Sequence, residues 1–169
     1  MTDSVNKKQG NIYGRMYEKA GDKSVDRSNV TQEEKKELIR QALVARERSY
    51  SPYSGYCVGA AVLTGTHRMY TGCNIENAAY TPTNCAERTA IFKAVSEGER
   101  TLTAIAIAGS PKGTVSQYAY PCGVCRQVMR EFADPEQMLV LIVKSETEYI
   151  EKTLAELLPE SFGPENLEK

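Results

Sequence analysis

Apolar residues recur at helical spacing in the first regular stretch of the chain. When residues 32–49 are wound as a helix, one face carries Leu38, Ile39, Ala42, Leu43 and Ala45. Thr31, followed three residues later by Glu34, has the capping-box pattern that marks a helix start. The pattern therefore predicts a helix over residues 32–49 that packs one face on a core.

Short apolar runs alternate with helix-like segments along the rest of the chain. The runs that predict strands are residues 57–64, 68–73, 102–109, 138–144 and the first part of 149–159. Helices are expected at 85–96, at 122–132 and in the last part of 149–159, with Gly98 ending the first of these. One helix, two strands and then alternating strands and helices predict an α/β fold. Its mixed sheet would carry helices on both faces.

Residues 1–30 lack this periodicity and carry scattered charges. They predict a mobile polar N-terminal extension before a single domain over residues 31–169. The extension has no apolar signal-peptide core, and no run approaches the roughly 20 apolar residues of a membrane span. We therefore expect a cytoplasmic protein with no membrane partner. The formal net charge of -1 offers no basic field for nucleic acid.

Three of the five cysteines suggest a metal site. Cys122 and Cys125 have the C-x-x-C spacing that lets two thiolates reach one tetrahedral zinc, although a redox pair has the same spacing. The third candidate is Cys85, which stands alone far upstream. A structural zinc site usually has a second close pair, whereas three protein ligands and an open position are typical of a catalytic site. The single histidine, His67, falls in a predicted turn and is not expected to be a ligand.

Charged residues follow the candidate ligands directly. Glu87 comes two residues after Cys85, so its carboxylate can lie beside a metal without binding it. Three thiolates on one Zn²⁺ leave a formal charge of about -1, which opposes ionisation of a bound water. Helix N-termini at both cysteine segments, and a hydrogen bond from Arg88, would offset that charge. For Arg126 two interpretations stay open, a donor to the thiolates or a solvated helix residue.

Three long segments resemble the small zinc cytidine deaminases of nucleoside salvage, the homotetrameric type. They read GCNIENAAYTPTNCAERTAIFKAVSEGE, PCGVCRQVMREF and ELLPESFGPENL. They contain the general zinc deaminase signature, and the resemblance extends over roughly residues 32–169. It implies a three-layer α/β/α sandwich with a central mixed sheet of about five strands. It also implies one Zn²⁺ per chain, held by Cys85, Cys122 and Cys125, and a homotetramer whose sites are shared between subunits.

The resemblance further implies hydrolysis of cytidine and deoxycytidine to uridine and deoxyuridine with release of ammonia. A zinc-bound hydroxide would attack C4 of the base while Glu87 shuttles protons. Asn74 and Glu76 would hold the ribose hydroxyls. The backbone around Ala86 would read the edge of the base, and Phe162 would close over the base in the site of a neighbouring subunit.

The chain departs from the family pattern at one wall of the expected pocket. It reads Tyr56-Cys57-Val58 where the family usually has Phe-Pro-Val. Tyr56 still offers a ring face for stacking, and its hydroxyl needs a polar partner or water. The loop before Pro121 is rich in tyrosine, with Tyr118 and Tyr120, and is expected to shape the mouth of the site.

Two other functions stay open at this point. One is a deaminase of another aminated heterocycle, such as a blasticidin-type antibiotic. The other is a zinc-stabilised binding module, which would need a fourth protein ligand and no catalytic glutamate.

Overall fold

The computed structural model describes residues 30–167, and its elements follow the order that the sequence predicts. The first half consists of α1 (Gln32–Arg46), β1 (Tyr56–Thr64), β2 (Met69–Cys73), α2 (Ala86–Ser96) and β3 (Leu102–Pro111). The second half consists of α3 (Gly123–Phe132), β4 (Leu139–Val143), β5 (Tyr149–Thr153), α4 (Leu154–Leu157) and a 3-10 helix (Pro164–Leu167). The predicted extension of residues 1–30 lies outside the described part, apart from Val30.

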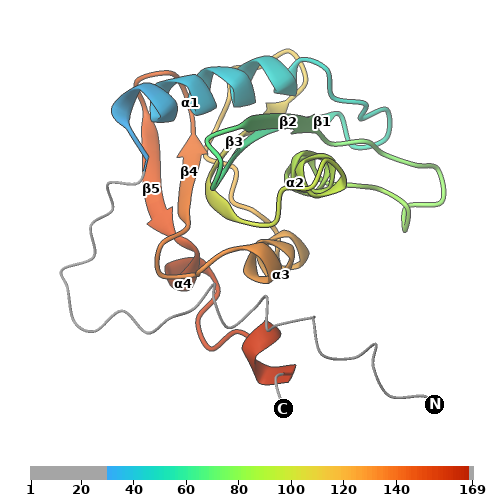
Figure 1. Ribbon diagram of the computed structural model, residues 1–169. Coiled ribbons are helices and arrows are strands. Elements are labelled where there is room, and N and C mark those ends of the chain that lie inside the picture. The colour runs from blue at the N-terminus through green and yellow to red at the C-terminus, as the bar shows by residue number, and fades with distance from the viewer. Residues whose placement is uncertain (1–29, 168–169) are drawn as a thin grey trace, which may run out of the picture.

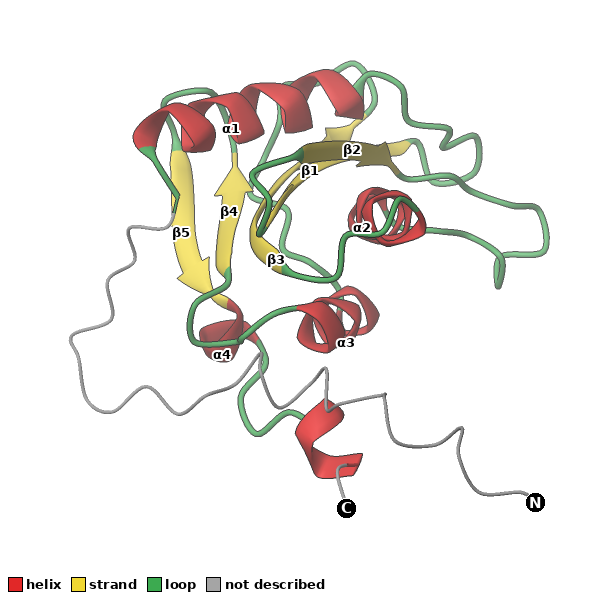
Figure 2. Ribbon diagram, viewed as in Figure 1, coloured by secondary structure: helices red, strands yellow, loops and turns green. Residues whose placement is uncertain are grey.

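The five strands form one mixed sheet in the order β2-β1-β3-β4-β5. Only β3 and β4 pair in parallel, and the other neighbouring pairs are antiparallel. Helix α1 covers one face of the sheet, and α2, α3 and α4 lie on the other side (Figure 1). The three layers are easily followed when helices and strands are coloured separately (Figure 2). The predicted three-layer α/β/α sandwich with helices on both faces is thus confirmed.

Strand β3 shows why the two faces differ. Because side chains alternate across a strand, Ala104, Ala106 and Ala108 join the core under α1. Ile105 and Ile107 point the other way, into the core beneath α2 and α3. All five side chains are buried. The continuous apolar run in the sequence therefore reflects a central strand covered on both faces.

The helix ends agree with the sequence except at one boundary. Thr31 and Glu34 form the predicted capping box at the start of α1. Gly98 follows α2 with a φ of +100°, the left-handed conformation expected of a glycine after a helix. Helix α1, however, ends at Arg46 rather than at residue 49. The amides of residues 47–49 bond to carbonyls three residues back, which makes turns instead of a further α-helical turn.

Two glycines let helices approach the sheet closely. A Cβ at Gly59 would overlap the backbone of α1 at Ala42 and Arg46. A Cβ at Gly72 would overlap the backbone of α2 at Ala86 and Ala90. The first turn of α2 is therefore held directly against β2, which fixes the position of every side chain on that turn.

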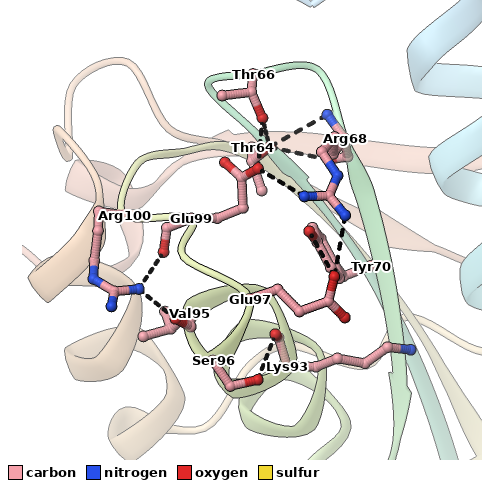
Figure 3. Close-up of polar contacts among 10 residues, drawn as sticks. All are labelled: Thr64, Thr66, Arg68, Tyr70, Lys93, Val95, Ser96, Glu97, Glu99 and Arg100. Carbon is pink, nitrogen blue, oxygen red and sulfur yellow. Dashed lines mark hydrogen bonds and ion pairs between the residues drawn. The ribbon is translucent and has the colours of Figure 1, made fainter.

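Polar side chains hold the opposite end of α2 to the turn between β1 and β2 (Figure 3). Arg68 forms ion pairs with Glu97 at 3.1 Å and Glu99 at 3.5 Å. The Thr66 hydroxyl donates to Glu99 at 2.7 Å, and the Tyr70 hydroxyl donates to Glu97 at 3.3 Å.

Among residues 30–167, no helix has the length and apolar character that crossing a membrane demands.

Candidate active site

Three cysteine sulfurs meet where α2 and α3 begin. The sulfurs of Cys85, Cys122 and Cys125 all lie within 4.8 Å of one another. Cys85 is the N-cap of α2, and Cys122 is the N-cap of α3, where its sulfur accepts a hydrogen bond from the Cys125 amide at 3.5 Å. No histidine, aspartate or glutamate of the described residues joins this group. Three soft sulfur donors with room for a further ligand suit a catalytic zinc ion.

The surroundings of Cys85 favour the ionised form of its sulfur. The guanidinium of Arg88 lies 3.7 Å from the Cys85 sulfur and donates to the Thr83 carbonyl at 3.2 Å. A hydrogen bond from Cys125, with a further one from Arg88, lowers the pKa of the Cys85 thiol to about 5. The same contact with Cys85, together with burial, raises the pKa of Cys125. Both cysteine segments also lie at helix N-termini, where partial positive charge stabilises an anion.

Glu87 lies on the first turn of α2, two residues after Cys85. Its side chain is buried, with the residue only 4% exposed. Burial raises the pKa of the Glu87 carboxyl to about 7, and the nearby charge of Cys85 adds to the effect. A carboxyl group whose pKa lies near neutrality can both accept and return a proton, as a general base and then a general acid must.

Cys85, Cys122 and Glu87 line one cavity of about 380 Å³, while Cys125 is buried behind them. That volume lies within the range of small-molecule sites. The lining residues come from β1, the segment before α2, the first turn of α2 and the segment before α3. They are Tyr56, Val58, Asn74, Thr83, Asn84, Cys85, Ala86, Glu87, Tyr118, Ala119, Tyr120 and Cys122. None of these is a lysine, arginine or histidine, so the cavity offers no cationic side chain to a phosphate group.

Of the residues that the resemblance assigns to the substrate, Tyr56, Asn74 and Ala86 line this cavity. Asn74 is already bonded within the fold. Its Oδ1 accepts from the Val58 amide at 2.8 Å and the Ser49 hydroxyl at 2.6 Å. Its Nδ2 donates to the Tyr56 carbonyl at 2.8 Å. One amide hydrogen of Asn74 is left for a ligand, so this side chain can orient the cavity wall and donate to a ligand.

Glu76 and Phe162 do not line the cysteine cavity within one chain. The Glu76 carboxylate accepts from the amides of Tyr53 at 2.8 Å and Ser54 at 3.2 Å. Hydrogen bonds from Ser54 and Tyr53 lower the pKa of this carboxyl. Glu76 lines a separate cavity of about 310 Å³, which shares Thr83 with the first. Phe162 lines neither cavity and is 59% exposed.

Sequence reasoning missed several residues of the cavity wall. Thr83 and Asn84 immediately precede Cys85, and that position was the signal that could have identified them. The predicted contribution of Tyr118 and Tyr120 to the wall is found, and Ala119 lies between them.

Arg126 fits neither of the two interpretations that the sequence left open. Its guanidinium donates to the carbonyls of Pro121 at 2.8 Å and Leu157 at 2.6 Å. It therefore connects the segment before Cys122 to the end of α4, and no hydrogen bond joins it to a sulfur among the described residues.

Comparison with known proteins agrees with this geometry. Residues 32–141 match the family model described as the cytidine and deoxycytidylate deaminase zinc-binding region. The cytidine deaminase of Sporosarcina psychrophila is 48% identical over 77% of this chain and 92% of that protein. The probable cytidine deaminase of Dictyostelium discoideum is 39% identical over 82% of this chain and 90% of that protein. The crystal structure of cytidine deaminase from Burkholderia pseudomallei has a TM-score of 0.68 and 40% identity, and covers 79% of this chain and 100% of that chain.

The fold, the cysteine cluster and these matches define a zinc-dependent deaminase. More narrowly, the chain belongs to the cytidine and deoxycytidylate deaminase family, as the resemblance in its sequence predicts. A binding module stabilised by zinc would need a fourth protein ligand, and the described residues provide only three. That alternative is therefore set aside in favour of an enzyme.

Proposed function

We propose that this chain hydrolyses cytidine and deoxycytidine to uridine and deoxyuridine with release of ammonia. The observation that carries the proposal is the buried Glu87 carboxyl in the same cavity as the three-cysteine cluster. The names of the similar proteins support cytidine as the substrate. The cavity wall, which has no cationic side chain, supports a nucleoside in preference to a nucleotide or polynucleotide.

Cys85, Cys122 and Cys125 would hold one zinc ion per chain. When bound there, zinc would supply Lewis-acid activation of water. Glu87 accepts a proton from the attacking water and passes it to N3 of the base, as the water oxygen bonds to C4. A second proton reaches the exocyclic amine through the same carboxyl, the C4–N bond breaks, and ammonia leaves. The balance is one nucleoside and one water giving one deaminated nucleoside and one ammonia.

The remaining residues bind and orient the nucleoside. Tyr56 presents a ring face to the base, and the backbone at Ala86 binds the edge of the base. Asn74 uses its free amide hydrogen on a ribose hydroxyl, and Glu76 accepts from the ribose where the two cavities approach at Thr83. Arg88 stabilises the ionised sulfur of Cys85 through its contact with that atom.

The active unit is a homotetramer in which Phe162 borders the site of a neighbouring subunit. Its side chain is 59% exposed and lines neither cavity of its own chain, which supports this arrangement. Residues 31–169 form the deaminase domain, the enzyme works in the cytoplasm, and neither nucleic acid nor membrane is a partner.

Spectrophotometry tests the proposed reaction. Purified zinc-loaded enzyme should consume cytidine and deoxycytidine, with loss of the absorbance of the cytosine base. Treatment with a chelator should stop the reaction, and added zinc should restore it. A cytosine-containing antibiotic nucleoside of the blasticidin type serves as the competing substrate. Turnover of the antibiotic but not of cytidine would contradict the proposal.

A further inference from the structure

One face of α3 holds the C-terminal tail, which we define as residues 158–167. Arg130 is the centre of this contact and is only 4% exposed. Its Nε donates to the Ser161 hydroxyl at 3.0 Å, and its Nη2 forms an ion pair with Glu165. Gly163 packs so closely that a Cβ there would overlap the guanidinium of Arg130. We call the contact of Arg130 with these three residues the tail contact.

Phe162 lies between two residues of the tail contact, Ser161 and Gly163, yet its side chain is exposed. The Gln127 amide donates to the Phe162 carbonyl at 3.0 Å, so its backbone is held by α3 as well. Residues on both sides of Phe162 are fixed, while Phe162 itself is 59% exposed. One exposed apolar side chain needs no explanation by itself. Here, however, Gln127 and Arg130 of α3 hold the backbone on which the exposed ring stands. The position of the ring on the surface is therefore restricted.

Burying the charged guanidinium of Arg130 carries a desolvation cost. Its Nη1 is buried without a hydrogen-bond partner among the described residues. Replacing a buried ion pair by apolar residues is often neutral or stabilising, so stability alone gives a weak reason for an arginine here. The planar guanidinium does, however, fix two tail residues at once, which a flexible apolar side chain cannot do.

We propose that Arg130 is a positioning residue that sets the tail so that the Phe162 ring enters the site of a second copy of this chain. The proposal rests on the shared site described under the proposed function. Helix α3 begins at Cys122 and Cys125 of its own active site. Further along the helix, Arg130 holds the tail that would reach the active site of a second subunit. Arg130 touches neither substrate nor metal and acts only through Phe162.

Fluorescence tests the tail contact without any reaction. The sequence contains no tryptophan, so Phe162→Trp gives the zinc-loaded full chain a single reporter. We expect high anisotropy in this variant, a clear fall when Arg130→Met is added, and an intermediate value with Arg130→Lys. Gly163→Ala, which disturbs the same contact from the tail side, should also lower the anisotropy. Equal anisotropy with and without Arg130→Met would overturn the proposal.

Steady-state kinetics then test whether the contact serves the neighbouring site. Phe162→Ala should raise KM for cytidine by about 5- to 150-fold, the range for one lost base–aromatic stack. Arg130→Met should raise KM in the same direction with a smaller effect on kcat. The double variant should match Phe162→Ala within about twofold, because the two residues act as one unit. Independent effects that multiply would overturn the proposal, because Arg130 would then act by another route.

Controls separate this inference from the proposed function. Arg68→Met removes an arginine with two ion pairs at the far end of α2 and should change neither anisotropy nor KM. If Phe162→Ala leaves KM unchanged, the shared site is wrong, and the positioning role falls with it even where the anisotropy detects the tail contact. If Phe162→Ala raises KM while Arg130→Met changes nothing, the shared site stands and only the role of Arg130 is overturned.

Discussion

The two ends of α2 each carry a buried glutamate, and the two carboxyl groups have different surroundings. Glu87, at the N-terminal end, is 4% exposed, and Glu99, just beyond the C-terminal end, is 8% exposed. Glu99 accepts from Thr66 and pairs with Arg68. Glu87 lies beside three sulfurs, and burial raises the pKa of its carboxyl to about 7. Similar burial thus stabilises the fold at one end and prepares proton exchange at the other.

The comparison predicts opposite results for the same substitution at the two positions. Glu87→Gln keeps the shape of the side chain but removes the proton carrier, so kcat should fall by at least about 10²–10⁴-fold. Zinc content should stay at one per chain, because three cysteines remain, and the melting temperature should not fall, because a costly buried acid is gone. Metal analysis, calorimetry and kcat check this. Activity within tenfold of the unaltered enzyme would mean that another group moves the proton.

Arg88→Gln tests the charge balance at the same end of the helix. The sulfur cluster would lose the guanidinium that lies 3.7 Å from Cys85. We expect the fold to stay intact and zinc affinity or turnover to fall by about 10- to 100-fold, as for other residues that support metal ligands. A competitive zinc chelator measures the affinity. Unchanged affinity together with unchanged turnover would remove this role from Arg88.

Glu99→Gln is the matched change at the other end. It weakens the ion pair with Arg68 while the carbonyl oxygen can still accept from Thr66. We expect stability to fall by about 1 kcal/mol, which corresponds to a melting temperature lower by about 2–4 °C. Zinc content and kcat should not change. A loss of turnover without a loss of stability would show that Glu99 acts on the active site through α2. The two ends of α2 would then not have separate roles in stability and catalysis.

Deleting residues 1–28 should have the smallest effect. The cut leaves Val30, which is 7% exposed and packs in the core beneath α1. A polar segment with few apolar residues has little to contribute to that core, so stability should change by less than about 0.5 kcal/mol. Thermal melting of the shortened and full chains measures the difference. A large fall in melting temperature would show that the extension packs on the domain.

Sequence alone could predict those parts of the site that depend on short spacings. Cys85 and Glu87 share one helical turn, as do Cys122 and Cys125, so local geometry places each pair. The alternation of β3 likewise predicts a strand covered on both faces. Those features need no knowledge of which segments meet in space.

Contacts between distant segments could not be predicted in the same way. The tail contact joins Arg130 to residues more than thirty positions further along the chain, and an arginine on a helix is usually solvated. The sequence left two interpretations of Arg126 open for the same reason, because its partner Leu157 belongs to another element. The family resemblance implies a ribose-binding role for Glu76, but it could not predict that the carboxylate accepts from the amides of Tyr53 and Ser54 within the chain.

Gly72 limits how this sequence can vary. It binds no ligand and carries no side chain, yet the backbone of α2 fills the space where a Cβ would be. Because Glu87 stands on the same turn of α2, even an alanine at Gly72 would move the carboxyl relative to the sulfurs on α3. In directed evolution, Gly72 on β2 is therefore a position that tolerates no substitution without disturbing the site. A search limited to residues that contact the ligand would overlook it. Libraries aimed at new substrates should leave Gly72 unchanged and vary Tyr118 and Tyr120, which line the cavity.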